Sequence, residues 1–341
     1  MKKILSIILI ASSAVMASAQ DVHFSQMGNA PLILNPALAG VGHNMQAIAN
    51  YRTQWNSVAQ PFTTTAASLD VRANGNQRNK QGHLAFGINF FNDKAGSEQV
   101  STTNINASIA YHAHIDNSNT ISFALSPGFG QRSLDGATGR WASQYNGSAY
   151  DGLLPSGENL SRNKFGFFDV GAGVVFTSEE WQRSLAATSQ KYFRTGLAFH
   201  HLTRPNYSFT ESGEDQLPVR VSFFANGQVP IAETNVSIMP GIYYQRQRSA
   251  SEFMLGTDVR YTLTEGSRVT GRVKESHVLF GVYYRFKDAA VIKAGLEYFN
   301  YAFGISYDVN VSTLSETAKS TSAIELFLRY RIPEGGNSRR L

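Results

Sequence analysis

The sequence predicts an all-β protein, a transmembrane antiparallel β-barrel of about fourteen strands with a short N-terminal periplasmic segment. Three observations support this prediction. The chain starts with an export signal, its hydrophobic residues recur with a period of two, and its composition is rich in aromatic residues but poor in charge. Together they place the protein in a bacterial outer membrane.

The first residues have the three parts of a secretory signal peptide. Lys2 and Lys3 form the basic start, residues 4–16 are apolar, and Ala17-Ser18-Ala19 has the small-x-small pattern that signal peptidase cleaves. We therefore expect residues 1–19 to be removed. The apolar run is shorter than the roughly twenty residues of a spanning helix, which disfavours a retained anchor. Because no cysteine follows it, a lipoprotein anchor is excluded.

Composition narrows the class of protein. Charged residues make up 16% of the chain and aromatic residues 12%, and no segment after residue 20 is apolar enough for a transmembrane helix. A barrel with a wet lumen has this profile because only alternate residues face lipid. The net charge of +5 falls to +3 without Lys2 and Lys3, and there is no basic block, so we expect no nucleic-acid partner. The absence of cysteine excludes disulfides and thiolate metal sites.

About fourteen segments have the length of roughly ten residues that a tilted strand needs to cross a bilayer. In 322–332, for example, Leu326 and Leu328 lie on the face opposite Glu325 and Arg329, as expected between lipid and a wet lumen. The predicted strands are 45–54, 61–71, 84–91, 100–113, 119–131, 166–177, 191–202, 217–229, 234–246, 251–263, 277–285, 288–298, 301–309 and 322–332.

Aromatic residues near the strand ends suggest the interfacial girdle of a barrel. They are Tyr51, Trp55, Phe91, Tyr111, Tyr192, Phe193, Tyr261, Tyr298 and Tyr330.

Loop lengths give a second indication. If the chain before the first strand is periplasmic, the longest connection, 132–165, is external, and so is loop 203–216. The short connections near 114–119 and 229–232 are then periplasmic turns. A soluble β-sandwich or propeller is the alternative, but the export signal, the even strand number and the low charge favour the membrane barrel.

The sequence contains no HExxH, GxSxG or P-loop signature. His200 and His201 are adjacent in a predicted strand, so their side chains should point to opposite faces and cannot bind one metal. His112 and His114 share a face but have no third ligand at a suggestive spacing. We therefore predict no catalytic residue, no metal site and no cofactor. An outer-membrane hydrolase stays an alternative, because function depends on a site rather than on a fold.

The segment before the barrel differs from the rest of the chain. Residues 20–44 form this segment, 45–332 the predicted barrel and 333–341 a polar tail. Asn35-Pro36 biases the chain to turn, and Gly40 permits a positive φ where the first strand begins. The apolar residues of the segment are too few for a domain, and we expect them to tuck into the periplasmic mouth of the barrel.

Three motifs stand at this end of the chain: Q-D-x-x-F-S-Q, P-L-x-L-N-P-A-x-A-G and Y-R-x-Q-W. They resemble the start of PorP/SprF family outer-membrane proteins of the Bacteroidetes, and residues 86–96 also fit that family. The matching residues are Gln20, Asp21, Phe24, Ser25, Gln26; Pro31, Leu32, Leu34, Asn35, Pro36, Ala37, Ala39, Gly40; and Tyr51, Arg52, Gln54, Trp55.

The resemblance implies a barrel of the type IX secretion system. It also implies partners: an exported protein cargo with a C-terminal sorting domain, and type IX secretion or gliding components on the periplasmic side. The external loops or the lumen would hold the cargo, and we place the contact on loops 132–165 and 203–216. Trp141, Tyr145 and Tyr150 are the candidate anchors, since aromatic residues dominate interface energetics. A passive channel or transporter for a small solute is the alternative function.

Overall fold

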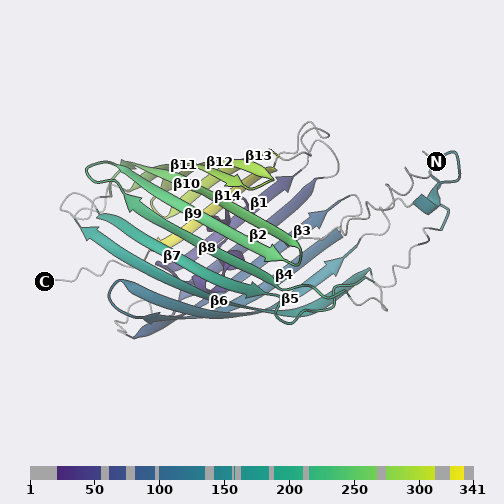
Figure 1. Ribbon diagram of the computed structural model, residues 1–341, viewed down its shortest axis with the longest axis horizontal. Coiled ribbons are helices and arrows are strands. Elements are labelled where there is room, and N and C mark those ends of the chain that lie inside the picture. The colour runs from purple at the N-terminus through teal and green to yellow at the C-terminus, as the bar shows by residue number, and fades with distance from the viewer. Residues whose placement is uncertain are drawn as a thin grey trace, which may run out of the picture.

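The computed structural model describes residues 21–54, 61–73, 81–96, 100–134, 142–155, 157, 163–183, 188–209, 215–266, 274–311 and 323–333. Strands consecutive in the chain pair antiparallel, and β1 pairs with β14, so the sheet closes into a barrel (Figure 1). The predicted fold class is therefore confirmed. The predicted signal peptide and the polar tail from residue 334 lie outside the described residues.

The strands are β1 His43–Gln54, β2 Phe62–Arg72, β3 Gly82–Ala95, β4 Val100–His114, β5 Asn119–Ser133, β6 Lys164–Arg183, β7 Thr188–His200, β8 Arg220–Pro230, β9 Val236–Gln247, β10 Ala250–Thr264, β11 Ser276–Arg285, β12 Ala289–Tyr298, β13 Tyr301–Asn310 and β14 Ala323–Pro333. The helical pieces are η1 Met27–Asn29, α2 Pro31–Leu34, η2 Pro36–Leu38 and η3 Ala142–Gln144. Within the described ranges, no helix is long and apolar enough to span a membrane.

The two faces of the strands differ as the alternation predicted. In β14, Leu328 is 53% exposed on the outer surface, whereas Glu325 is 1% exposed inside. Outward aromatic residues such as Tyr111, Tyr261 and Tyr298 agree with the expected girdle. Phe91 and Tyr192 do not. Phe91 is buried with Phe24 of the N-terminal segment, and Tyr192 lies on the inner face of β7 beside Arg194, whose guanidinium is 4.4 Å from its ring centre, so the assignment of both to the girdle was wrong. A side chain one position along a strand faces the other way, and strand propensity alone does not reveal which.

We call the end of the barrel where β1 starts and β14 finishes the proximal end, and the opposite end the distal end. The long connection between β5 and β6 leaves the barrel at the distal end, as does the connection between β7 and β8. The strand β6 is 20 residues long and extends well beyond the predicted 166–177 at its proximal end, where it pairs with β7.

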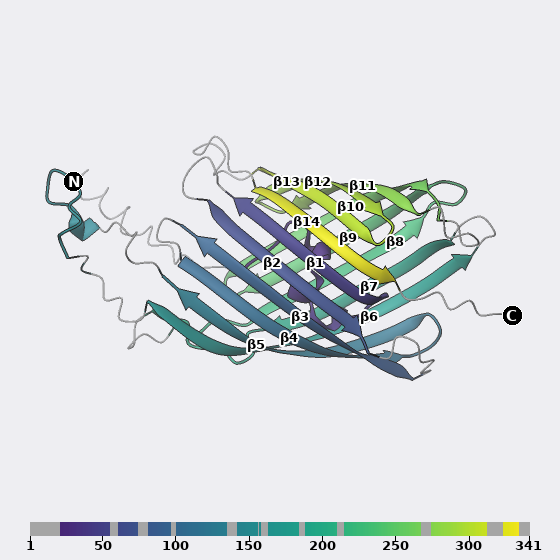
Figure 2. The same ribbon diagram turned by 180° about the vertical axis from the view of Figure 1, so that it is seen from behind.

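The chain before β1 lies inside the barrel. In both ribbon views this purple segment is enclosed by the ring of strands (Figure 1, Figure 2). Most of its side chains from Phe24 onward are buried, including Leu32, Leu34 and Ala37. The sequence suggested a segment tucked into the mouth of the barrel, but the structure shows it running through the lumen. We call residues 21–42 the luminal segment.

Candidate functional site

The luminal segment connects the two ends of the barrel. At its start, Asp21 lies beside His201 and Arg220, where β7 ends and β8 begins at the distal end. At its finish, the Gly40 amide donates to Asp70 Oδ2 over 2.7 Å near the proximal end of β2. Between these points the chain contacts side chains from strands all around the wall. The lumen and its segment therefore form the candidate site.

A buried group of charges binds the segment at Ser25 and Gln26. The Ser25 and Gln26 amides donate to the two carboxylate oxygens of Glu325 over 2.7 and 3.0 Å. Ser25 Oγ donates to Asp308 Oδ2 over 2.6 Å and accepts from the Arg52 guanidinium. Arg52 also forms ion pairs with Asp308 at 3.2 Å and with Glu325 at 3.3 Å. Charged hydrogen bonds of this kind are stronger than neutral ones, so this part of the chain is firmly held.

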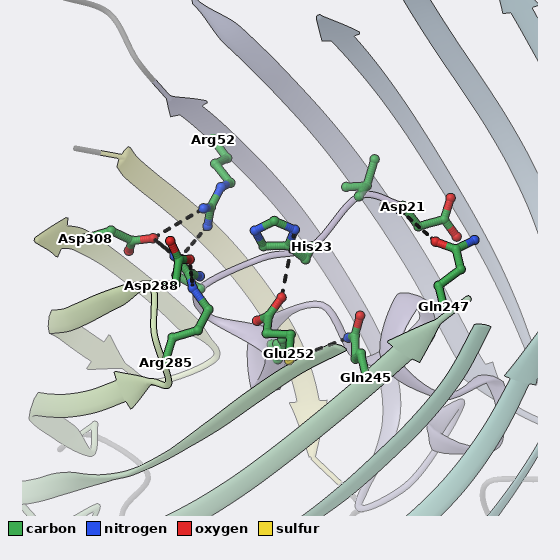
Figure 3. Close-up of polar contacts among 12 residues, drawn as sticks. Asp21, His23, Arg52, Gln245, Gln247, Glu252, Arg285, Asp288 and Asp308 are labelled. Carbon is green, nitrogen blue, oxygen red and sulfur yellow. Dashed lines mark hydrogen bonds and ion pairs between the residues drawn. The ribbon is translucent and has the colours of Figure 1, made fainter. Parts of the chain in front are cut away.

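A second arginine balances the charge of this cluster. Arg285 Nη2 lies 2.8 Å from Asp308 Oδ2, and its Nη1 donates to Ser25 Oγ over 3.2 Å. Figure 3 shows Arg52 and Arg285 converging on Asp308 from different strands. Two guanidinium groups thus face these two buried carboxylates, and their pairing offsets part of the cost of burying the charges.

The start of the segment has its own set of charged partners. His201 lies between Asp21 and Asp169, with its Nδ1 2.6 Å from Asp169 Oδ2. Burial lowers the pKa of His201, but the carboxylates on both sides outweigh burial and raise it to about 9. At neutral pH the imidazole is therefore a cation that binds Asp21. Arg220 adds a second cation, 3.5 Å from Asp21.

The same region corrects one sequence prediction. Strand β7 ends at His200, and His201 follows it with a φ of 61°. His201 therefore does not continue the strand alternation, and it turns into the site while His200 Nε2 lies 3.4 Å from the Leu34 carbonyl. A left-handed residue after a strand leaves little trace in the hydrophobic pattern, so it could not be predicted from the sequence.

Further contacts line the distal opening beside Asp21. The Asp21 amide donates to Gln247 Oε1 over 2.9 Å, and His23 Nδ1 lies 3.9 Å from Glu252 (Figure 3). The cavity between these groups measures about 20 Å³, roughly the room that one water molecule needs.

Asn35 and Pro36 determine the conformation of the second half of the luminal segment. The Asn35 side chain accepts from the Ala37 amide over 2.9 Å, which caps η2, and donates to the Val174 carbonyl of β6 over 3.1 Å. Pro36 occupies the first turn of η2, where its missing N–H costs nothing. A Cβ on Gly173 would lie 2.1 Å from Asn35 Oδ1, so glycine in the wall makes this close approach possible.

The turn into β1 fits the prediction for Gly40. Its φ is 72°, the left-handed conformation expected at this turn. Just before it, the Ala39 carbonyl accepts from His112 Nε2 over 2.8 Å. His112 is therefore a polar contact for the segment.

At the distal end, the loop after β7 folds back over the opening. Tyr207 and Phe209 pack against Phe165 and Phe167 of β6. The guanidinium of Arg132 lies 3.9 Å from the centre of the Tyr207 ring. This loop thus covers part of the distal mouth of the barrel.

Comparison with known proteins identifies the family. The family described as "Type IX secretion system membrane protein PorP/SprF" matches residues 16–330. The chain belongs to the PorP/SprF family. It is thus a β-barrel membrane protein of the type IX secretion system. No curated protein sequence matches the chain.

The comparison of this PorP/SprF barrel with solved structures concerns the fold alone. The chain resembles the "TodX monoaromatic hydrocarbon channel deltaS2 mutant" with a TM-score of 0.50 and 10% identity, covering 90% of this chain and 94% of that chain. CymD, also described as a monoaromatic hydrocarbon channel, has a TM-score of 0.47 and 12% identity, covering 90% and 93%. BamA from Haemophilus ducreyi lacking POTRA domains 1-3 has a TM-score of 0.40 and 8% identity, covering 84% and 70%.

The structure brings most of the PorP/SprF motif residues together in the lumen. Those buried inside the barrel are Phe24, Ser25, Gln26, Asn35, Pro36, Gly40 and Arg52, with Pro31 at the start of α2. Tyr51 instead faces outward, 43% exposed, since it neighbours the inward Arg52 in β1. Gln54 is the last residue of β1, and Trp55 lies outside the described residues.

The partners of these motifs on the barrel wall were not predicted from the sequence. They include His201, Arg220, Arg285, Asp308 and Glu325. A signal was available, because each is an ionisable residue at an inward-facing strand position or next to a strand end. The sequence does not show which of these positions lie at the same depth in the lumen, because they belong to strands far apart in the chain.

The predicted cargo loop is only partly described. Tyr145 and Tyr150 form an isolated β-bridge and are 59% and 44% exposed, whereas Trp141 lies outside the described residues. Leu153, 95% exposed, is in the same loop. In the described part of the chain, no group of three or more His, Cys, Asp or Glu residues could hold a metal ion.

Proposed function

We propose that this PorP/SprF barrel is a non-catalytic component that receives, secretes or anchors an exported surface protein and connects it to the periplasmic machinery of secretion or gliding. Membership of the type IX system supports association with secretion components. Cargo with a C-terminal sorting domain is the partner that the family resemblance suggests.

The observation that carries this proposal is the luminal segment itself. A channel for solutes needs a continuous path through the lumen, yet the segment crosses it, and the cavity at its distal end has room for about one water molecule. The contacts of Ser25 and Gln26 with Glu325 hold the segment in place. With the lumen occupied in this way, partner proteins would meet the barrel at its rims and loops.

The charged groups in the lumen also argue for a structural role. Glu325 accepts two backbone amides, and Arg220 donates to the Val22 and Ile33 carbonyls over 3.3 and 3.2 Å. These groups therefore serve the segment's own backbone. This use supports the expectation that the protein is not an enzyme.

The loop with Tyr145 and Tyr150 is our candidate for cargo contact. Both rings are exposed in the long connection between β5 and β6, which leaves the barrel at the distal end. Because outer-membrane barrels carry their long loops on the outside, we take the distal end as the external one. Exposed aromatic side chains supply contact area at a low entropy cost when a partner binds.

The test is affinity purification of the tagged full-length barrel from native membranes in a mild detergent. We expect an exported protein with a C-terminal sorting domain to co-purify. Tyr145→Ala/Tyr150→Ala should reduce its recovery. Ile231→Ala, which removes an exposed apolar residue from the turn after β8 at the proximal end, should not.

Two results would overturn the proposal. One is the absence of such a protein from purifications of the unaltered barrel. The other is a large, steady conductance in planar bilayers, which would favour the solute channel.

A further inference from the structure

The pair β1 and β14 differs from every other neighbouring pair in the barrel. All other neighbours follow one another in the chain, whereas β1 and β14 are its first and last strands. The directly paired residues Arg52 and Glu325 are 273 positions apart. Bringing distant segments together costs more chain entropy than closing a hairpin. We call this β1–β14 contact the seam.

The luminal segment contacts both sides of the seam at two levels. At the distal level, Ser25 and Gln26 bind Glu325 of β14, and Ser25 binds Arg52 of β1. Arg52 and Glu325 are register partners, so the segment sits on the cross-strand pair itself.

The second level lies nearer the proximal end. The Asn29 carbonyl accepts from Asn50 Nδ2 of β1 over 3.1 Å. The Asn29 side chain accepts from Arg329 Nη1 of β14 over 3.3 Å. One residue of the segment therefore binds the first strand with its backbone and the last strand with its side chain.

The inward-facing register pairs of β1 and β14 differ in whether their side chains bind each other directly. Arg331 of β14 donates to Gln46 of β1 over 2.8 Å without the segment, closest to the proximal end. In the distal direction, the inward register pairs are Ile48 with Arg329 and Asn50 with Phe327, neither of which joins two polar groups. Asn29 supplies the missing polar link at this height.

We propose that residues 25–29 act as a clasp that fastens the seam. The segment is covalently continuous with β1 and binds Glu325 and Arg329 of β14 through side chains and backbone. It thereby takes the place of the direct chain connection that every other strand pair has. Docking of the segment and closure of the barrel are, on this view, one event.

The test compares two double variants of the full-length barrel. Ser25→Ala/Asn29→Ala removes side-chain contacts at the seam. Ser222→Ala/Gln247→Ala removes contacts of the segment with the opposite wall, where Ser222 donates to the Leu34 carbonyl over 2.7 Å and Gln247 accepts from the Asp21 amide over 2.9 Å. We expect both to lower the temperature at which the barrel loses its compact, SDS-resistant migration by several degrees.

A disulfide across the seam separates the two effects. Ala49 and Leu328 are register partners that face outward, so Ala49→Cys/Leu328→Cys can link β1 to β14. After oxidation, this link should restore the transition temperature of the seam variant and leave the deficit of the wall variant. A control link within the β11–β12 hairpin, Val282→Cys/Ile292→Cys, should rescue neither.

The clasp is refuted if the seam variant has an unchanged transition temperature, or if the seam disulfide rescues both double variants equally or rescues neither. If Ser25→Ala/Asn29→Ala does not fold without the disulfide but folds with it, the proposal is supported. If it folds with neither link, Asn29→Ala alone provides the same comparison.

Discussion

Substitution of Arg52 should test whether the luminal charge cluster stabilises the barrel. Arg52 is 1% exposed and forms ion pairs with Asp308 and Glu325. In Arg52→Ala, only Arg285 is left to balance these carboxylates at the Ser25 site. Removing one partner from a buried ionic network costs about 3–5 kcal/mol, because it leaves an uncompensated charge. Urea unfolding in detergent, followed by circular dichroism of the strands, should show a loss of this size.

An exposed ion pair supplies the matched control. Lys191 and Glu180 lie 3.7 Å apart with side chains 51% and 60% exposed. Because water screens such a pair, Lys191→Ala should cost less than about 1 kcal/mol. In addition, Arg52→Met/Glu325→Gln should lose less than the sum of its single variants, with a coupling of about 0.5–3 kcal/mol. If Arg52→Ala were as mild as Lys191→Ala, our view of the lumen as a network that needs balanced charge would be incorrect.

Three further predictions concern single features of the lumen. The pKa of His201 is raised from 6.5 to about 9, so its hold on Asp21 is fully present below pH 6.5 and lost as pH rises through 9. A spin label at Val22→Cys should therefore gain mobility in that range, but not in a His201→Asn background. Gly40→Ala places a Cβ 2.6 Å from the Ala85 Cβ at a φ of 72°. It should destabilise the fold by more than the roughly 1–2 kcal/mol that left-handed strain alone costs. Gly147→Ala, with a φ of 95° and open space around it, measures that strain alone in the same urea titration. Tyr207→Ala removes the ring beneath Arg132 and should make the loop after β7 more sensitive to added protease, while the midpoint of barrel unfolding changes little. An unchanged digestion pattern would contradict a role for this ring in holding the loop.

The barrel wall could be predicted from the sequence because its signal is local. In β14, each inward charge such as Glu325 has an outward aliphatic neighbour, so a few consecutive residues determine both strand and orientation. Where the local signal was ambiguous, the prediction failed: Phe91 has the propensity of a girdle residue but packs inside on Phe24. The outer surface is therefore better predicted than the inner one.

The path of the luminal segment could not be predicted for a different reason. Its motifs, such as Phe24-Ser25-Gln26, can be read from the chain, but their partners come from strands separated by hundreds of residues. Matching them requires the depth of each strand in the closed barrel, which depends on register and tilt rather than on composition. The resemblance to a family identified the motifs as important without showing where they lie.

The size of the barrel explains why such a segment is present. About eight strands enclose a space that side chains can fill, whereas a ring of 14 strands leaves a wider lumen. A chain that enters it must satisfy its own backbone groups away from bulk water. The wall therefore supplies polar partners for these groups: Glu325 for two amides, Arg220 and Ser222 for three carbonyls, and Asp70 for the amide of Gly40. Inward charge, which the sequence suggested would line a wet interior, is instead used to bind protein backbone.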